Sequence, residues 1–169
     1  LSDNGGPNKN GRVDNFPFSG FEGSDLYEGG IRTPFLMQWP NKIKPKTKYS
    51  KPVISLDIFA TMKSIINPEL ELPNEIHGKN ILPYILGEKE GYPHEDLFWK
   101  YNGSFNIINN DTIKVPPRYA IRSGKYKMII EEDETFLYDL NNDVSETNNL
   151  AELENAIVKE LRQKIMSWD

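Results

Sequence analysis

The second half of the chain carries the pattern that most restricts its fold, a series of short strand-like segments rich in apolar and aromatic residues. There are four of them, at residues 97–99, 118–122, 125–130 and 136–140. The alternation is clearest in the third, where Tyr126, Met128 and Ile130 share one face and Lys125 and Lys127 share the other. A period of two is typical of a strand with one face against a core.

The connections and the segment that follows predict how these strands pack. Ser123-Gly124 and Asp133-Glu134 have the right length for hairpin turns. Toward the C-terminus, apolar residues recur every three or four positions with charged residues between them, at Leu150, Leu153, Ile157, Leu161, Ile165 and Trp168. This spacing is typical of an amphipathic helix. We therefore predict a small α+β domain, a four-stranded antiparallel sheet with one long C-terminal helix on one face.

The first 95 residues are richer in turns. Residues 1–30 contain many Gly, Asn, Asp and Pro residues without a helical or strand period, which predicts a loop. Residues 31–39 predict a buried strand. Residues 55–66 predict a helix that Ser55 or Asp57 can cap. Its apolar stripe comprises Ile58, Met62, Ile65 and Ile66.

Composition excludes several classes of function. A net charge of −5 argues against a nucleic-acid partner, because such partners select basic surfaces. No apolar run approaches the roughly 20 residues of a membrane span. The chain has no cysteine, which excludes disulfides, a cysteine zinc site and a cysteine nucleophile within it. Its two histidines, His77 and His94, argue against a multi-histidine metal site.

Two glycine pairs near the N-terminus suggest half of a built site. The chain opens on Ser2-Asp3-Asn4-Gly5-Gly6, and residues 27–34 read Tyr-Glu-Gly-Gly-Ile-Arg-Thr-Pro. A carboxylate and an amide oxygen are hard ligands, and glycines let the backbone fold tightly around them. Taken alone, the motif fits equally a simple turn in which Asp3 and Asn4 bond to their own backbone. For Glu28 and Arg32 we expect ion pairs or backbone hydrogen bonds that set the turn into the strand that follows.

In their order along the chain, these features resemble the C-terminal part of the sulfatase family, in the alkaline-phosphatase-like superfamily. The resemblance is greatest to bacterial arylsulfatases that act on glycans. The matching segments are residues 2–5, 27–34, 39–40, 55–61, 118–128, 137–140 and 143–150. The resemblance implies that residues 1–95 are the C-terminal piece of an α/β domain and that residues 96–169 form a C-terminal α+β subdomain. The parent protein would be a sulfuric ester hydrolase, periplasmic or secreted.

The resemblance also implies site roles. Asp3 and Asn4 correspond to two ligands of an active-site calcium ion. The family's nucleophile is a formylglycine made within a Cys/Ser-x-Pro-x-Arg motif, which this chain lacks. We therefore expect the formylglycine and the remaining ligands to lie upstream, and the chain alone to be inactive. The expected substrate is a sulfated carbohydrate or aryl sulfate.

Two positions near the expected pocket depart from the family's pattern. Glu22 occupies the slot of a lysine that contacts the sulfate, and a carboxylate there has the opposite charge. The nearest lysine in sequence, Lys9, is less well placed. His77 falls in a loop at the expected pocket mouth. Two interpretations of His77 stay open, a contact with the substrate and a surface position without a role. Such departures are compatible with a different substrate geometry, another cation, or a degenerate enzyme.

Two other functions stay open. One is a non-catalytic binding module derived from a sulfatase, which Glu22 favours. The other is a phosphate-ester hydrolase of the same superfamily, which the scarcity of histidine disfavours. We further expect that the chain on its own exposes strand edges and apolar surface, so that it self-associates or leaves residues 1–30 disordered.

Overall fold

A computed structural model describes residues 1–7, 14–22, 26–102, 105–108, 111–114 and 116–168, with residues 105–108 and 111–114 as backbone only. The chain divides into two compact units. One contains residues 1–36 and 96–169, and the other residues 37–95. The expected division at residue 95 falls at one of these junctions, but residues 1–36 group with the C-terminal sheet and not with residues 37–95.

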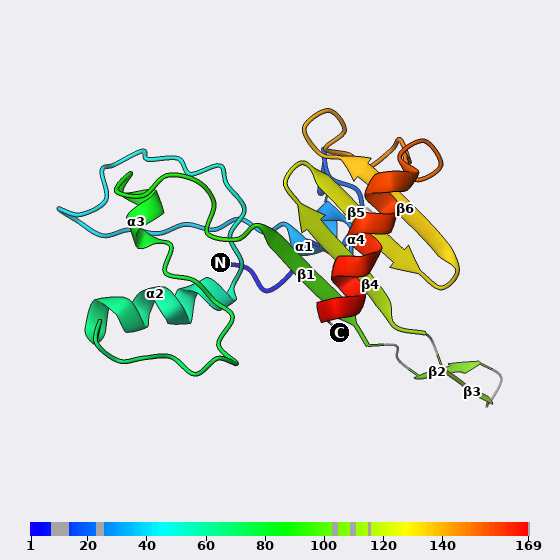
Figure 1. Cartoon of the computed structure of the whole chain (residues 1–169), viewed down its shortest axis with the longest axis horizontal. Helices are drawn as coiled ribbons and strands as arrows, with labels where there is room; N and C mark the ends of the chain where they lie inside the picture. Colours follow the sequence, from blue (N-terminus) through cyan, green and yellow to red (C-terminus); the bar gives the residue numbers. More distant parts are fainter. Residues whose placement is uncertain (8–13, 23–25, 103–104, 109–110, 115, 169) are drawn as a thin grey trace. The chain divides into compact units, whose positions relative to one another are not determined.

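The first unit is built on the predicted sheet. Four strands, β1 (Asp96–Tyr101), β4 (Arg118–Ser123), β5 (Tyr126–Glu131) and β6 (Glu134–Asp139), pair antiparallel in the order β1-β4-β5-β6. Helix α4 (Asn155–Trp168) lies across one face of the sheet (Figure 1). The predicted α+β architecture is therefore confirmed.

Element boundaries differ from the sequence prediction by one or a few residues. The β4–β5 turn is Gly124-Lys125, with Gly124 at φ 56°, and the β5–β6 turn is Glu132-Asp133, with Glu132 at φ 52°. Both predicted turns were one residue out of register. Helix α4 begins at Asn155, so Leu153, which we assigned to its apolar stripe, lies before the helix and is exposed. A second hairpin of β2 (Phe105–Ile108) and β3 (Asp111–Lys114) was not predicted.

Both faces of the four-stranded sheet are covered. On one face, Leu161 and Ile165 of α4 pack against Ile121, Met128 and Leu137. On the opposite face a second apolar cluster forms. Leu26 packs there with Ala120, Ile129, Tyr138 and Leu140. Covering both faces makes this sheet the centre of a three-layer unit, whereas the sequence indicated one covered face.

Between residues 26 and 36 the chain forms α1 (Glu28–Ile31) and then runs on without a ladder partner among the described residues. The strand predicted over residues 31–39 is therefore wrong. Exposure does alternate along it, and Leu36 is 85% exposed. The alternation fits an extended segment, but a strand also requires a neighbour for its backbone hydrogen bonds.

The second unit contains α2 (Leu56–Ile66) and the short α3 (Leu82–Ile85). The predicted helix is confirmed, and the Asp57 carboxylate accepts hydrogen bonds from the backbone N–H groups of Ile54 (2.9 Å) and Lys79 (2.8 Å). His94 Nε2 lies 2.7 Å from the same carboxylate. The buried face of α2 consists of Asp57, Ala60 and Thr61, whereas most of its apolar side chains face outward.

Candidate functional site

The Asp3-Asn4-Gly5-Gly6 loop packs backbone to backbone against α1. The N–H of Gly5 donates to the carbonyl oxygen of Gly30 at 2.8 Å. A Cβ atom on Gly5 would stand 1.7 Å from the carbonyl oxygen of Gly29, so no larger residue fits without moving one of the two segments. The two glycine motifs, which are more than twenty residues apart in sequence, therefore form one structural element.

A third segment, residues 15–20, completes this glycine cluster. The Asn15 amide accepts from the Gly6 N–H (3.1 Å) and donates to the carbonyl oxygens of Gly6 and Gly20, both at 3.0 Å. The Gly29 N–H donates to the Ser19 carbonyl oxygen at 2.6 Å. Sequence reasoning missed Asn15. The signal that could have found it is an asparagine among glycine-rich loops, since one amide can satisfy several backbone groups.

Within this cluster, Asp3 and Asn4 occupy a loop whose following glycines, Gly5 and Gly6, are hydrogen-bonded to Gly30 and Asn15. The Asp3 side chain is exposed, and its described contact is the Ser2 hydroxyl at 3.5 Å. The same hydroxyl donates to the Asn4 carbonyl oxygen at 2.9 Å. In the described part of the chain, no three His, Cys, Asp or Glu side chains are grouped as a metal site. Asp3 and Asn4 would thus supply two oxygen donors and need further ligands.

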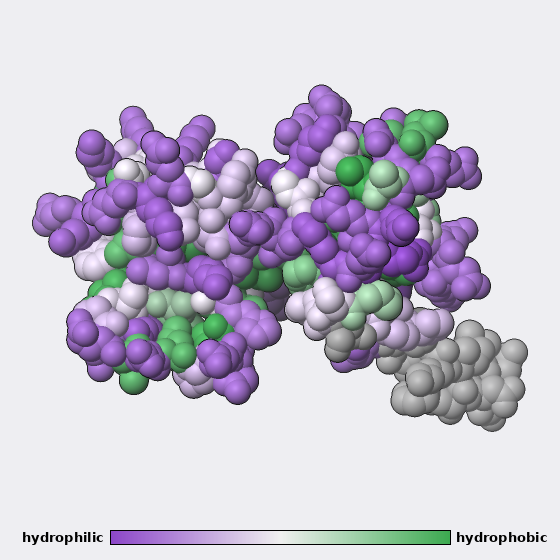
Figure 2. Space-filling view, viewed as in Figure 1, coloured by the Kyte–Doolittle hydropathy of each residue, from purple (hydrophilic) through white to green (hydrophobic). Residues whose placement is uncertain are grey.

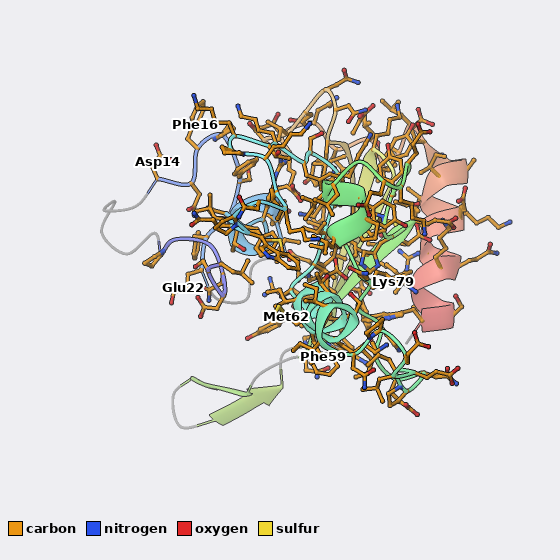
Figure 3. All side chains as sticks on the ribbon, turned by 90° about the vertical axis from the view of Figure 1, so that its left-hand side faces the viewer. Asp14, Phe16, Glu22, Phe59, Met62 and Lys79 are labelled. Atoms are coloured by element: carbon orange, nitrogen blue, oxygen red, sulfur yellow. The ribbon has the colours of Figure 1, made fainter. Side chains whose placement is uncertain are left out.

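The two other predicted site residues lie in different units. Glu22 is exposed on the N-terminal loop (Figure 3), and its N–H donates to the Gly6 carbonyl oxygen at 3.1 Å. The structure therefore brings Glu22 beside the Asp3–Asn4 loop. His77 is an exposed residue of the second unit and is not part of the glycine cluster. Lys9 lies outside the described residues.

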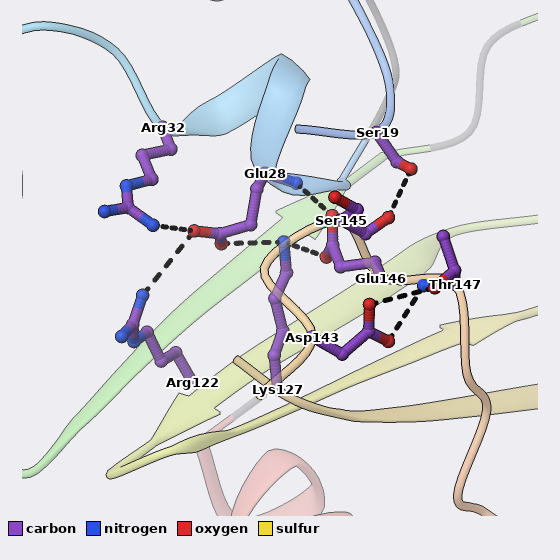
Figure 4. Close-up of polar contacts among 9 residues, drawn as sticks. All are labelled: Ser19, Glu28, Arg32, Arg122, Lys127, Asp143, Ser145, Glu146 and Thr147. Atoms are coloured by element: carbon purple, nitrogen blue, oxygen red, sulfur yellow. Dashed lines mark hydrogen bonds and ion pairs between the residues drawn. The ribbon is translucent and has the colours of Figure 1, made fainter. Parts of the chain in front are cut away.

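Beneath α1 lies a buried ion cluster made by residues far apart in sequence (Figure 4). Lys127 of β5 is fully buried, with its Nζ 3.0 Å from Glu28 Oε1 and 2.8 Å from Glu146 Oε1. Glu28 and Glu146 are 3% and 5% exposed. The Glu28 N–H also donates to Glu146 Oε2 at 2.7 Å. A buried ammonium needs such partners, because unpaired burial of a charge is costly.

Two arginines complete the cluster around Glu28. Arg32 and Arg122 place guanidinium nitrogens 3.3 Å and 3.5 Å from Glu28 Oε2. The expected Glu28–Arg32 ion pair is confirmed. Burial raises the pKa of the Glu146 carboxyl, and the Lys127 ammonium opposes that shift. The alternation of β5 placed Lys127 on the face opposite Met128, but it gave no sign that residues 26–31 cover that face of the sheet.

The chain resembles known sulfatases over most of its length. Residues 18–168 match the model of the family "N-sulphoglucosamine sulphohydrolase, C-terminal". A sulfatase of Formosa agariphila is 32% identical over 88% of this chain and 27% of that protein. The N-acetylgalactosamine-6-O-sulfatase of Bacteroides thetaiotaomicron is 29% identical over 83% of this chain and 28% of that protein.

Solved structures share the fold. The crystal structure of Ps i-CgsB, in complex with k-i-k-neocarrahexaose, superposes with a TM-score of 0.79 at 24% identity, covering 98% of this chain and 34% of that one. The chain thus spans about a third or less of the length of these relatives. Among the described residues, no helix is long and apolar enough to cross a membrane. From the family match over residues 18–168, the chain belongs to the N-sulphoglucosamine sulphohydrolase C-terminal family of sulfatase domains.

Proposed function

We propose that this chain is part of a calcium-dependent sulfuric ester hydrolase that releases sulfate from a sulfated carbohydrate. The observation that carries the proposal is the glycine cluster, which fixes the Asp3–Asn4 backbone and leaves the Asp3 carboxylate exposed. A carboxylate and an amide oxygen are donors that suit calcium. Bound calcium would offset the negative charge of a sulfate ester.

Each part of the chain has a distinct task in this proposal. Asp3 and Asn4 contribute ligands, and Glu22 lies beside their loop on the side expected to meet the sulfate. The C-terminal sheet holds α1, on which the loop rests. In this proposal the formylglycine nucleophile and the other ligands come from sequence outside this chain. The relatives' sulfatase names support the sulfuric ester hydrolase activity alone. We place the parent protein in the periplasm or outside the cell.

The test uses the full-length protein and replaces one ligand. Asp3→Ala should lower sulfate release from an aryl sulfate by more than about tenfold, because even groups that only support metal ligands contribute about 10–100-fold. Calcium chelation should abolish turnover of the wild-type protein, and added calcium should restore it. Asp133→Ala, at an exposed turn of the sheet, is the matched control and should leave turnover unchanged.

Glu22 favours a second candidate, a sulfatase-derived binding module without turnover. Such a module would bind sulfated oligosaccharides in an equilibrium titration and release no sulfate. A third outcome, faster release of phosphate than of sulfate from matched aryl esters, would identify a phosphate-ester hydrolase of the same superfamily. Sulfate release that is unaffected by both chelation and Asp3→Ala would overturn the calcium assignment.

A further inference from the structure

The ion cluster fixes the first residue of α1 in two independent ways. The Glu28 side chain is held by the Lys127 ammonium, and the Glu28 backbone N–H is held by the Glu146 carboxylate. Lys127 and Glu146 come from β5 and from the turn after β6, 99 and 118 residues away in sequence. A four-residue helix cannot hold its own position, because isolated short helices are unstable in water. The cluster is therefore one of the contacts that hold α1 in position.

From α1, rigid backbone contacts lead to the predicted metal loop. Gly29 and Gly30 directly follow Glu28. The Gly29 carbonyl oxygen lies where a Cβ atom of residue 5 would stand, and the Gly30 carbonyl oxygen accepts from the Gly5 N–H. The Thr33 hydroxyl, just after α1, adds a bond to the Ser2 carbonyl oxygen at 3.3 Å. Gly5 immediately follows Asn4, so that a shift of α1 would be passed to the Asp3–Asn4 backbone without a flexible side chain between them.

A second path joins the same two regions. The Ser19 hydroxyl donates to the carbonyl oxygen of Ser145, the neighbour of Glu146, at 2.5 Å. The Ser19 carbonyl oxygen in turn accepts from the Gly29 N–H at 2.6 Å. The turn that carries Glu146 therefore contacts both α1 and the segment beside Glu22.

We propose that the buried Glu28–Lys127–Glu146 cluster positions the Asp3–Asn4 loop for calcium binding, so that Lys127 and Glu146 of the C-terminal sheet domain are positioning residues for the active site. This inference rests on the proposed function, since it assigns the loop to calcium. The inference gives the sheet domain a role beyond stability. Lys127 of that sheet is fully buried, and its ammonium pairs with Glu28 of α1 and with Glu146.

The test compares Glu146→Gln and Lys127→Met with Lys125→Met in the full-length protein. Glu146→Gln keeps an acceptor for the Glu28 N–H and removes one charge, so it is the mildest change to the cluster. Lys127→Met removes the ammonium that Glu28 and Glu146 share and leaves Glu28 with its two arginines. If this variant does not fold, Glu146→Gln decides. Lys125→Met is the control: Lys125 is two residues away, its side chain is 45% exposed, and it pairs with Asp139 at 2.7 Å and not with Glu28 or Glu146.

Two readouts separate positioning from stability. The first is hydrogen exchange of the Gly5 N–H in calcium-free protein, which should become faster in the cluster variants and stay unchanged in Lys125→Met. The second is calcium affinity by titration calorimetry, which should weaken by about tenfold, the effect typical of residues that orient metal ligands. A role in stability alone would lower the melting temperature while leaving both quantities at their wild-type values.

The outcomes also separate this inference from the proposed function. If the wild-type protein binds calcium and the folded cluster variants bind it equally well, with unchanged Gly5 exchange, the positioning role is wrong and the proposed function stands. If the wild-type protein binds no calcium, the proposed function fails and this inference fails with it. Weaker binding in the cluster variants together with wild-type binding in Lys125→Met would establish the positioning role.

Discussion

At the scale of single residues, Asp143 organises the turn from which Glu146 reaches the ion cluster. Its carboxylate accepts hydrogen bonds from the N–H groups of Thr147 (2.9 Å) and Asn148 (2.8 Å) and from the Thr147 hydroxyl (3.0 Å). These bonds matter because Glu146 has a φ of 53°, a left-handed conformation that is unfavourable for a glutamate. Partial burial raises the pKa of Asp143, but the three hydrogen bonds outweigh it and leave the pKa below its ordinary value.

Asp143→Asn should therefore destabilise the protein in a pH-dependent way. A carboxyl whose pKa is lower in the folded state adds stability above its unfolded pKa, and that stability is lost as pH falls through the folded pKa. The stability difference between wild type and Asp143→Asn should be roughly 1 kcal/mol near neutral pH, since the site is partly exposed. It should shrink below about pH 4. Urea denaturation at several pH values measures it, with Asp133→Asn as control, and a difference independent of pH would contradict the prediction.

Single-residue contacts were predictable only where they are local. The Glu28–Arg32 pair joins residues four apart, and their spacing beside two glycines pointed to it. Lys127 was assigned only to the face opposite Met128, because strand periodicity indicates alternate faces but not what covers them. Its partner Glu28 lies 99 residues away, a separation that no local pattern encodes. The same limit applies to Asn15, whose bridging role exists only after three loops have come together.

At the scale of elements, the strands and the C-terminal helix were predictable because each carries a complete period of apolar residues. Leu161 and Ile165, two of the six residues in the predicted stripe, are the ones that become fully buried. The predicted turns were one residue out of register. The left-handed positions are Gly124 and Glu132, and a glutamate is not among the residues that indicate a turn in a sequence. The strand expected over residues 31–39 failed because an apolar run does not reveal whether a neighbouring strand is present.

Helix α4 should contribute to the stability of the sheet through its buried side chains Leu161 and Ile165, and Leu161 is the one to test. This side chain is 2% exposed and packs in the cluster that contains Ile121, Met128 and Leu137. Leu161→Ala should lower the free energy of unfolding by about 2–5 kcal/mol, the range for a buried leucine that leaves a cavity. Glu160→Ala, one residue earlier on the exposed side of α4, should change it by less than about 0.5 kcal/mol. Chemical denaturation measures both, and equal effects would show that α4 does not pack as described.

At the scale of the whole molecule, the least expected surface is the apolar side of α2. Ile58, Phe59, Met62 and Ile66 recur at helical spacing and are 38%, 58%, 47% and 76% exposed. Figure 2 shows apolar surface over α2, and Figure 3 shows Phe59 and Met62 on that helix. The helix buries its small and polar face instead, through Asp57, Ala60 and Thr61. A helix usually buries its apolar stripe, and a grouped exposed stripe marks a surface that another protein segment covers.

Because of this surface, the 169-residue chain should self-associate in solution. Sedimentation velocity should show oligomers at concentrations of about 10–100 µM, where exposed apolar surface commonly drives association. The double variant Phe59→Ser and Met62→Ser should increase the monomer fraction, since it removes two adjacent members of the stripe and leaves the buried face of α2 intact. Leu153→Ser is the matched control, because Leu153 is 78% exposed but stands apart from α2 in sequence and belongs to the other unit. If the wild-type chain stays monomeric over this range, or if Leu153→Ser restores monomers as well as the double variant does, the α2 surface is not what drives association.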